Sequence, residues 1–247
     1  MGAMIVTGAS RGIGAATALL AGQKGYSVVV NYRDNREAAE EVVDSIASEG
    51  GEAIAVAADI SDEKEVADLF GIATEEFGQL TALVNNAGIL HPQCDLQQMS
   101  VERLTQVFST NVIGSMLCAR EAVSLMSTDN GGAGGSIVNL SSIAATLGSP
   151  NEYVDYAASK GAIDSFTVGL ASEVASQNIR VNAVRPGVIY TDIHASGGEP
   201  DRVNRVKGNV PMQRGGEASE VAQAVMWLVS DDASYTTGAF INVSGGR

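Results

Sequence analysis

Hydrophobic residues along this chain form two kinds of pattern: short continuous runs, and longer stretches in which they recur every three or four positions. In the stretch 35–49, for example, Ala39, Val42 and Ile46 share one face while acidic residues occupy the other. Short runs bounded by turn residues predict buried strands, and the periodic stretches predict helices. We expect strands at 3–6, 27–31, 52–57, 82–85, 136–140, 180–184 and 239–243, and helices near 13–24, 35–49, 62–77, 100–126, 152–177 and 217–230.

The regular alternation of strand and helix predicts how these elements assemble. Strands separated by helices of this length form βαβ units, so we expect an α/β fold: one doubly wound parallel β-sheet (a Rossmann fold) flanked by helices on both faces. The glycine-rich stretch 129–135 could link two domains, but the alternation continues past it unchanged. Residues 1–247 are therefore predicted to form a single domain.

The turn between the first strand and the first helix reads Thr7-Gly8-Ala9-Ser10-Arg11-Gly12-Ile13-Gly14. Glycines at such a turn let the backbone approach a phosphate group closely, and the following helix N-terminus offers free N–H groups and a partial positive charge. The spacing G-x-x-x-G-x-G therefore predicts a dinucleotide site. Glycine-rich turns also occur in α/β domains that bind nothing, so this motif needs support from elsewhere in the chain.

The end of the second strand indicates which dinucleotide is bound. A carboxylate there would bind the adenine ribose hydroxyls and repel a 2′-phosphate, but this chain has Asn31, Tyr32 and Arg33, and Asp34 comes later, past the expected contact. Arg33 can form a charge-assisted fork to a phosphate. Together with Arg11 it favours NADP (NADPH) over NAD. The alternative is that Arg33 is a solvated loop residue.

A tyrosine and a lysine four positions apart form the candidate acid–base pair. Tyr156 and Lys160 share one face of the predicted helix, and a nearby cation would lower the phenol pKa from its ordinary value of about 10. Ser141 and Ser142 end the fifth strand, where ligands bind in open α/β sheets. Tyr153 is the rival phenol, but the residue four positions later is an alanine, which carries no charge.

Composition excludes several classes of function. The chain has 15 Lys and Arg against 29 Asp and Glu, a net charge of −14, which argues against a nucleic-acid partner. No apolar run approaches the roughly 18 residues of a membrane span, and no signal segment precedes the first strand, so we expect a cytoplasmic protein without a membrane partner. The two cysteines, Cys94 and Cys118, and two distant histidines predict neither a disulfide framework nor a metal site.

Taken in order, these motifs resemble those of the short-chain dehydrogenase/reductase family, over nearly the whole chain. The T-G-x-x-x-G-x-G loop is followed by an N-N-A-G motif, a helix asparagine, a strand-end serine, the Y-x-x-x-K pair and a P-G-x-x-x-T segment. The matching residues are Thr7, Gly8, Gly12 and Gly14; Asn85 to Gly88; Asn111; Ser142; Tyr156 and Lys160; and Pro186 to Thr191. One departure is the separation of Ser142 from Tyr156, which is one residue longer than in many members.

The resemblance implies roles for these residues. Tyr156 would be the proton donor in reduction, Ser142 would hold the substrate oxygen, Lys160 would bind the nicotinamide ribose, and Asn111 would support a water that links Lys160 to solvent. Asp59 would contact the adenine amino group. The full set of implied cofactor contacts is Gly8, Ser10, Arg11, Gly12, Ile13, Gly14, Asn31, Arg33, Asp59, Ile60, Asn86, Ala87, Gly88, Tyr156, Lys160, Pro186, Gly187, Ile189 and Thr191.

The function that follows is an NADP-dependent oxidoreductase that interconverts an alcohol and a ketone or aldehyde, with a sugar, a polyol or a small carbonyl compound as substrate. One alternative is a 3-oxoacyl-[acyl-carrier-protein] reductase, and another is a non-catalytic NADP-binding sensor. Residues 192–212 have a loop-like composition and are expected to form a mobile lid, in which His194 either contacts substrate or is a surface residue. The resemblance also implies a homotetramer, with a homodimer as the alternative.

Overall fold

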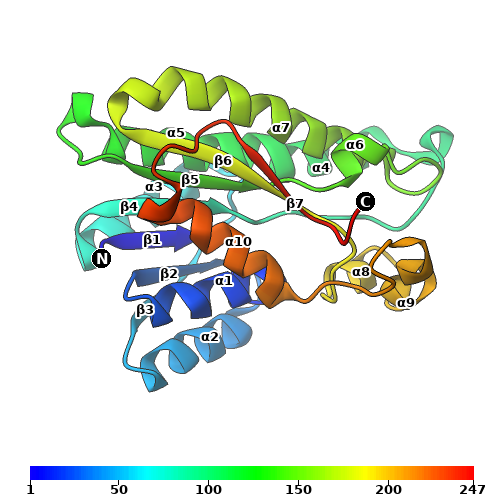
Figure 1. The fold of residues 1–247 in the computed structure, drawn as a ribbon, viewed down its shortest axis with the longest axis horizontal. Helices are drawn as coiled ribbons and strands as arrows, with labels where there is room; N and C mark the ends of the chain where they lie inside the picture. The colour runs from blue at the N-terminus through cyan, green and yellow to red at the C-terminus, as the bar shows by residue number, and fades with distance from the viewer.

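The computed structural model describes all 247 residues and contains one parallel sheet of seven strands (Figure 1). The strands run in the order β3-β2-β1-β4-β5-β6-β7, and every neighbouring pair is parallel. Their bounds are β1 (Ala3–Val6), β2 (Ser27–Tyr32), β3 (Glu52–Ala57), β4 (Leu80–Asn85), β5 (Gly135–Leu140), β6 (Ile179–Pro186) and β7 (Phe240–Val243). The predicted strands are thus all present; β2, β4, β5 and β6 extend one to three residues beyond the predicted bounds, and β7 begins one residue later.

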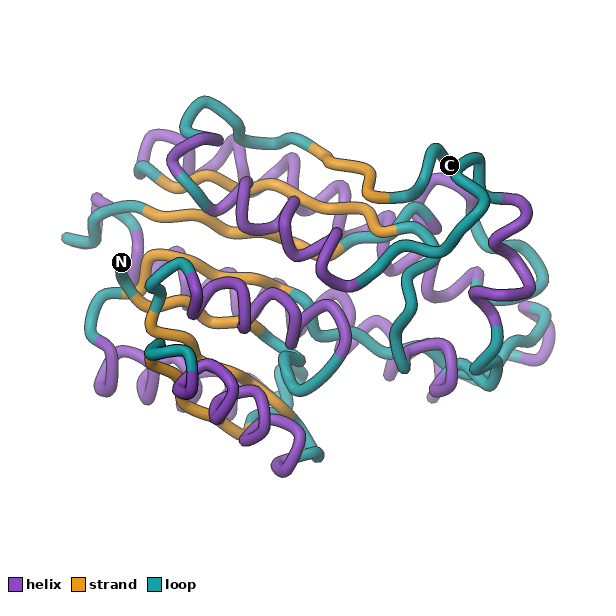
Figure 2. The backbone as a smooth tube through the Cα atoms, turned by 60° about the horizontal axis from the view of Figure 1, so that its bottom comes forward, coloured by secondary structure: helices purple, strands orange, loops and turns teal.

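Helices cover both faces of the sheet, as the doubly wound fold requires (Figure 2). One apolar core joins the sheet to α3 (Glu63–Phe77), α5 (Ser115–Met126) and α7 (Val154–Val174), and the other joins it to α1 (Gly12–Gln23), α2 (Arg36–Ser48) and α10 (Ala218–Val229). Strands buried on both faces need continuous apolar runs rather than alternation. The interior strand β1 meets this requirement, because all four of its residues are buried.

The order of the strands determines where a ligand can bind. The connections move outward in one direction from β1 through β2 to β3, and in the other direction from β4 onward. At this reversal the loops after β1 and β4 separate, which leaves a crevice at the carboxyl ends of the two strands. The glycine loop follows β1 and the N-N-A-G segment follows β4, so both predicted motifs lie at the crevice.

The helix expected at 100–126 is interrupted. It consists of α4 (Val101–Phe108), a π-helical turn (Ser109–Gly114) and α5, with no break in the chain direction. Periodicity did not predict the π turn, because one wider turn changes the spacing of apolar residues very little. Turns of this kind occur often at functional sites, and this one carries Asn111.

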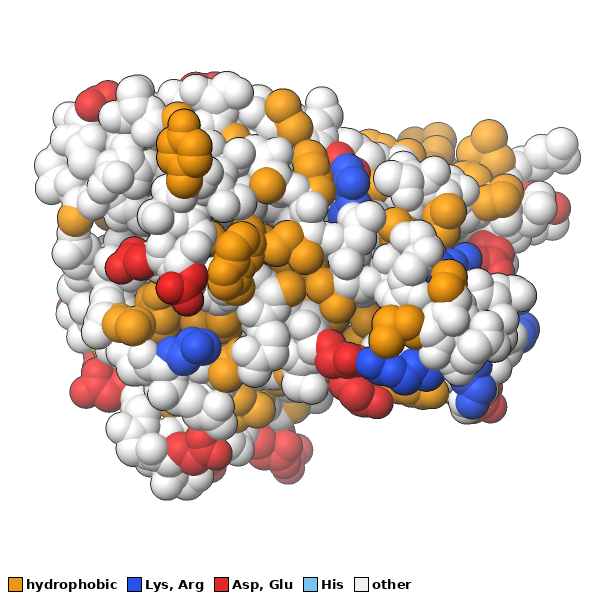
Figure 3. Space-filling view, in the orientation of Figure 1, with side chains coloured by type: hydrophobic (Ala, Val, Ile, Leu, Met, Phe, Trp, Pro, Cys, Tyr) orange, Lys and Arg blue, Asp and Glu red, His pale blue; other side chains and the backbone are white.

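Residues 192–212, which the sequence indicated as a mobile lid of loop-like composition, contain short helices, and their mobility stays a prediction. The segment forms α8 (Ile193–Ser196) and α9 (Arg202–Val206) in a lobe beyond the carboxyl ends of the strands, at the right of Figure 1. A small apolar cluster of Val188, Val203 and Val206 anchors α9 to the body of the protein. Basic and acidic side chains lie together on this lobe (Figure 3), and their ion pairs supply the order that a polar composition did not suggest.

A further short helix, α6 (Ala144–Leu147), follows β5 and was not expected. No helix in the structure combines the length and apolar character needed to cross a bilayer.

The fold predicts a large stability cost for a cavity in the central strand. Leu83 on β4 is fully buried in the sheet. Leu83→Ala is expected to lower the free energy of unfolding by about 2–5 kcal/mol, because it removes apolar contacts and leaves a void that the two packed faces cannot close. Urea denaturation measures the loss, and Ile72→Ala on the exposed side of α3 serves as the control. A loss no larger than that of the control would contradict this assignment of the core.

Candidate active site

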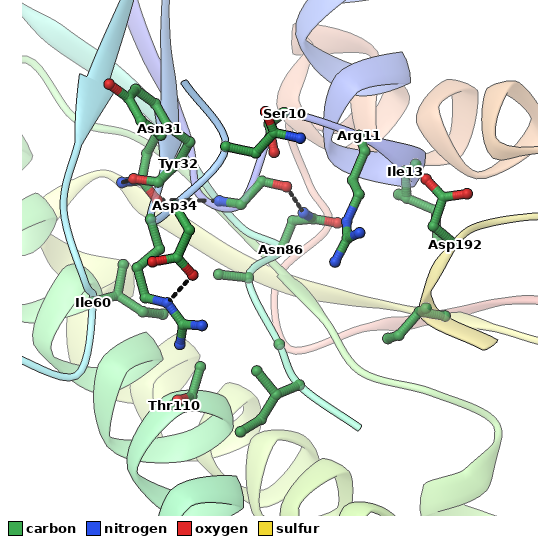
Figure 4. Close-up of a pocket in the computed structure, with 18 of the residues that line it drawn as sticks. Ser10, Arg11, Ile13, Asn31, Tyr32, Asp34, Ile60, Asn86, Thr110 and Asp192 are labelled. Carbon is green, nitrogen blue, oxygen red and sulfur yellow. Dashed lines mark hydrogen bonds and ion pairs between the residues drawn. The ribbon is translucent and has the colours of Figure 1, made fainter. Parts of the chain in front are cut away.

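Two adjoining cavities lie at the carboxyl ends of the strands. The first has a volume of about 400 Å³ and is bounded by the glycine loop and the end of β2 (Figure 4). The second has a volume of about 520 Å³ and contains the predicted catalytic side chains. They share the wall residues Ile13, Asn86, Gly88, Thr191 and Ile193, so one extended ligand could occupy both.

The glycine loop has the shape of a phosphate cradle. Gly8 and Gly12 have positive φ angles of 60° and 58°, a conformation that other residues rarely adopt. A Cβ on Gly14 would lie 2.5 Å from both Asn86 Nδ2 and Gly8 O, so only glycine allows α1 to pack this closely against the loop. Since α1 begins at Gly12, its first N–H groups are available beside the cavity.

Thr7 ties the glycine loop to the segment after β4. Its hydroxyl accepts hydrogen bonds from the backbone N–H groups of Asn86 and Ala87, both at 3.0 Å. In return Asn86 Nδ2 donates to the carbonyls of Thr7 at 2.8 Å and Gly8 at 3.0 Å. The predicted cofactor residue Asn86 therefore also maintains the shape of the loop.

Asn31 is placed at the first cavity as predicted, but its amide is used within the protein. Its Oδ1 accepts a hydrogen bond from Gly8 N at 3.1 Å, and its Nδ2 donates to the carbonyls of Val56 at 3.3 Å and Ala58 at 3.1 Å. The side chain thus joins β2, β3 and the glycine loop. Its contact with a cofactor stays a prediction.

Two arginines line the first cavity. Figure 4 shows the Arg11 side chain extending into the cavity from the glycine loop, and Arg33 lines the cavity at the end of β2. Arg33 Nε is paired with Asp34 Oδ2 at 2.7 Å, and both side chains are more than half exposed. Asp34 also lines this cavity, although the sequence suggested that it lay past the contact. An anion bound by Arg33 would therefore compete with the Asp34 carboxylate.

In the second cavity the three predicted catalytic side chains meet. Ser142 lies just after β5 and forms a hydrogen bond with Tyr156. Lys160, one turn further along α7, donates from Nζ to the carbonyl of Leu140 at 2.6 Å and lies 5.6 Å from the centre of the Tyr156 ring. The neighbouring Ser141 instead donates to the carbonyl of Lys160 at 3.2 Å, which supports Ser142 as the serine that faces the tyrosine.

Burial dominates the acid–base properties of this pair. It raises the pKa of Tyr156 to about 12, against a smaller opposite effect of the hydrogen bond with Ser142. It lowers the pKa of Lys160 to about 8, opposed by the charge of Asp164. The lowering of the tyrosine pKa that the sequence predicted is therefore not found, because desolvation of the phenolate outweighs the effect of Ser142.

Asn111 lies behind the cavity rather than in its wall. Its side chain binds both backbone groups of Ile89, accepting from the N–H at 2.8 Å and donating to the carbonyl at 3.1 Å, and it also donates to Ser159 Oγ at 3.1 Å. These bonds fix the segment after the N-N-A-G motif. The predicted role of Asn111 in holding a water stays a prediction.

The rival tyrosine has a different environment. The Tyr153 hydroxyl donates to the carbonyl of Gly197 at 3.3 Å, and the Arg202 guanidinium lies 4.9 Å from its ring centre. It therefore helps to hold the α8–α9 lobe, although it also lines the second cavity. Ser149 and Asn151, in the segment between Ser142 and Tyr156, adopt positive φ angles of 44° and 62°.

His194 also lines the second cavity. Its Nε2 lies 2.9 Å from the carbonyl of Ile189, which can only accept, so this nitrogen carries the proton. Burial lowers the pKa of His194, which favours the neutral form of the ring.

Most of the predicted cofactor residues lie where the motifs suggested. Those that line the first cavity are Gly8, Ser10, Arg11, Gly12, Ile13, Asn31, Arg33, Asp59, Ile60, Asn86, Ala87, Gly88 and Thr191. Those that line the second are Ile13, Asn86, Gly88, Tyr156, Lys160, Pro186, Gly187, Ile189 and Thr191, with Ser142 beside them. Gly14 and Asn111 line neither cavity and support the residues that do.

Several wall residues were missed, namely Tyr32, Asn35, Ile89, Thr110 and Asp192. All of them are close in sequence to a predicted site residue. The end of a strand could have indicated most of them, whereas Thr110 lies in the π-helical turn beside Asn111.

Comparison with known proteins places the chain among oxidoreductases. Residues 8–247 match the family described as enoyl-(acyl carrier protein) reductase. The chain is 60% identical over its full length to an uncharacterised oxidoreductase, YgfF, of Escherichia coli, which is also fully covered. It is 38% identical to glucose 1-dehydrogenase 2 of Bacillus subtilis, covering 98% of this chain and 93% of that protein. It is 37% identical to the 3-oxoacyl-[acyl-carrier-protein] reductase FabG of Staphylococcus aureus, covering 98% and 96%.

The buried lysine predicts a pH-dependent stability. Because the pKa of Lys160 is near 8 in the folded protein and 10.5 as its ordinary value, the unfolded chain binds more protons between these values, and stability rises with pH. The difference in unfolding free energy between wild type and Lys160→Met is expected to change by about 1–2 kcal/mol from pH 7.5 to 9.5. Denaturant titrations at the two pH values measure it, with Lys64→Met on exposed α3 as control. A difference that is independent of pH would contradict the lowered pKa.

Proposed function

This chain is an oxidoreductase of the short-chain dehydrogenase/reductase family, and on that premise we propose that it uses NADP to interconvert an alcohol and a ketone or aldehyde. The observation that carries the proposal is the meeting of Ser142, Tyr156 and Lys160 in a cavity that adjoins the glycine cradle. The cradle fits a diphosphate because Gly8 and Gly12, which line it, carry no side chains, and the first N–H groups of α1 are available beside it. When bound, NADPH supplies the hydride.

The three side chains divide the remaining chemistry between them. Tyr156 donates its phenolic proton to the carbonyl oxygen, and Ser142 donates a hydrogen bond to the same oxygen as negative charge develops there. Lys160 holds a positive charge close to the phenol, since its ammonium lies 5.6 Å from the Tyr156 ring centre. A phenol whose pKa is about 12 retains its proton at pH 7, which suits the direction of carbonyl reduction.

Arg11 and Arg33 support the preference for NADP. Both guanidinium groups line the cavity beyond the cradle, where a 2′-phosphate would replace the exposed Asp34 carboxylate as the partner of Arg33. The exchange is favourable because a phosphate carries more charge than the carboxylate, and an exposed ion pair is worth only about 0–1 kcal/mol.

A small hydroxylated compound fits the substrate cavity better than a carrier-protein thioester. A carrier protein is strongly acidic and would need a basic surface beside the active site. Between residues 121 and 177 the only basic residue is Lys160, which is buried. Of the two arginines that line the cavity, Arg202 and Arg247, the first is already paired with Glu152 and Glu199. The polar wall formed by Ser149, Glu152 and His194 suits a sugar or polyol, and a relative is named glucose 1-dehydrogenase.

A non-catalytic sensor is a less favoured alternative. Such a protein would be expected to have lost part of the catalytic set, and this chain retains Asn111, Ser142, Tyr156 and Lys160.

The chain is further proposed to assemble into a tetramer. Exposed apolar side chains at Ile113, in the π-helical turn, and at Met116, in α5, support this proposal.

Replacing the proton donor tests the mechanism. Tyr156→Phe is expected to reduce turnover by about a thousandfold or more and to leave NADPH affinity within about twofold, since only the proton-transferring group is removed. NADPH oxidation with a panel of aldehydes, diketones and sugars measures turnover, and fluorescence titration measures affinity. Tyr153→Phe is the matched control and is expected to retain turnover. If the two variants exchange these results, Tyr153 is the proton donor.

Reversing the charge at the end of β2 tests the cofactor. Arg33→Asp is expected to shift the ratio of kcat/KM values from NADPH toward NADH by about tenfold or more, because a carboxylate repels the 2′-phosphate and can bind the ribose hydroxyls. The control is Arg36→Asp, which makes the same charge change at an exposed position outside both cavities. An unchanged ratio would rule out the proposed role of Arg33.

A further inference from the structure

A buried ion pair lies directly beside the proposed proton donor, and the mechanism above does not use it. Arg103 on α4 binds Asp155 on α7, with Nε 2.7 Å from Oδ2 and Nη2 3.2 Å from Oδ1. The Asp155 side chain is only 1% exposed and that of Arg103 13%. Burying two charges costs desolvation energy, so such a pair is weak support for stability alone.

The third nitrogen of the Arg103 guanidinium group binds the loop segment 92–94. Its Nη1 donates to the carbonyl of Pro92 at 2.6 Å and contacts Cys94 Sγ at 3.0 Å. The backbone N–H of Cys94 donates in turn to the carbonyl of Glu152 at 3.3 Å, just before α7. One guanidinium group therefore joins α4, the segment 92–94 and the first turn of α7.

The same segment reaches the cofactor side of the site. Asn111 forms hydrogen bonds with both backbone groups of Ile89. The neighbouring Gly88 lies close to Lys160, because a Cβ on Gly88 would be 3.6 Å from Lys160 Nζ and 3.4 Å from Asn111 Oδ1. Residues 88–94 are thus held at one end by Asn111 and at the other by Arg103. Both of these residues come from the continuous helical stretch of α4 and the π turn.

We propose that Arg103 and Asp155 are positioning residues for Tyr156. Asp155 immediately precedes Tyr156, so the fork fixes the first turn of α7, and with it the phenol, relative to the segment that borders the cofactor cavity. Neither residue lines either cavity, so neither touches substrate or cofactor. The inference rests on the proposed function, in which Tyr156 transfers the proton.

The geometry gives the pair a measurable effect on rate. Proton transfer and hydride transfer must reach the same carbonyl, and a misplacement of about 1 Å can cost about a hundredfold in rate. Burial is the largest single influence on the pKa of Asp155 and would raise it, but the hydrogen bonds from Arg103 and from backbone N–H groups, together with the charge of Arg103, hold this pKa below its ordinary value. The pair therefore remains charged near neutral pH. Lysine cannot replace the fork, because it has one nitrogen in place of three.

The test uses the full chain with Asp155→Asn and Arg103→Lys, compared with Arg180→Lys. Arg180 is a matched control, since its guanidinium binds the carbonyls of Leu228, Val229 and Ser230 at the opposite end of the sheet. Each test variant is expected to lower kcat by about tenfold or more, with the NADPH Kd within about twofold of wild type. The double variant should be no worse than the worse single variant, because the two residues act as one unit.

Crystal structures of wild type and Asp155→Asn with NADPH give a readout that does not depend on turnover. The Tyr156 hydroxyl is expected to move away from Ser142 Oγ in the variant. If a single variant does not fold, Arg103→Met combined with Asp155→Leu removes both charges and should fold. This double variant is expected to show the same decrease in kcat as the single variants.

Two results would overturn the inference: kcat values no lower than that of Arg180→Lys at equal melting temperature, or an unmoved Tyr156 hydroxyl. A wild-type protein that binds NADPH but reduces no carbonyl compound would instead overturn the proposed function, and the displacement of Tyr156 would then decide this inference by itself.

Discussion

The structure depends on the close contact between the loops that follow β1 and β4. A Cβ on Gly8 would lie 2.9 Å from the Cα of Ala87, and the Thr7 hydroxyl accepts hydrogen bonds from two successive backbone N–H groups of the opposite loop. At this short separation, the polar groups of the two loops can form these hydrogen bonds in only one alignment of the loops. The cradle and the catalytic cavity share a wall because these two loops meet.

The charges that line the second cavity differ in sign from the net charge of the protein. The chain carries a net charge of −14, yet the second cavity is lined by a lysine and two arginines against one glutamate. That glutamate, Glu152, is engaged by Arg202 and Arg205 of the α8–α9 lobe. Local charge at the site is thus opposite in sign to that of the whole molecule, and arguments from net charge apply only to its outer surface.

Much of the fold and of the site could be predicted from the sequence, because both depend on local signals. Apolar runs and helical periodicity report which faces are buried, and strand ends identify the loops of the crevice. The α8–α9 lobe could not be predicted, since its order comes from ion pairs such as Arg202 with Glu152, fifty residues apart. The tyrosine pKa was also beyond reach, because desolvation depends on how completely α7 is covered. Asn31 shows the remaining difficulty: its position was predicted, but its four hydrogen-bond partners within the protein were not.

The π turn at Ser109–Gly114 restricts how this chain can change in length. It places Asn111 inward while α5 continues in the same direction with its own buried face. Deleting one residue here would leave an ordinary helix, but would rotate everything on one side by about 100° relative to the other. Either Asn111 would turn away from Ile89, or Cys118 and Ala122 would leave the core. Homologous chains that retain both contacts should therefore tolerate substitutions in this turn far more readily than insertions or deletions.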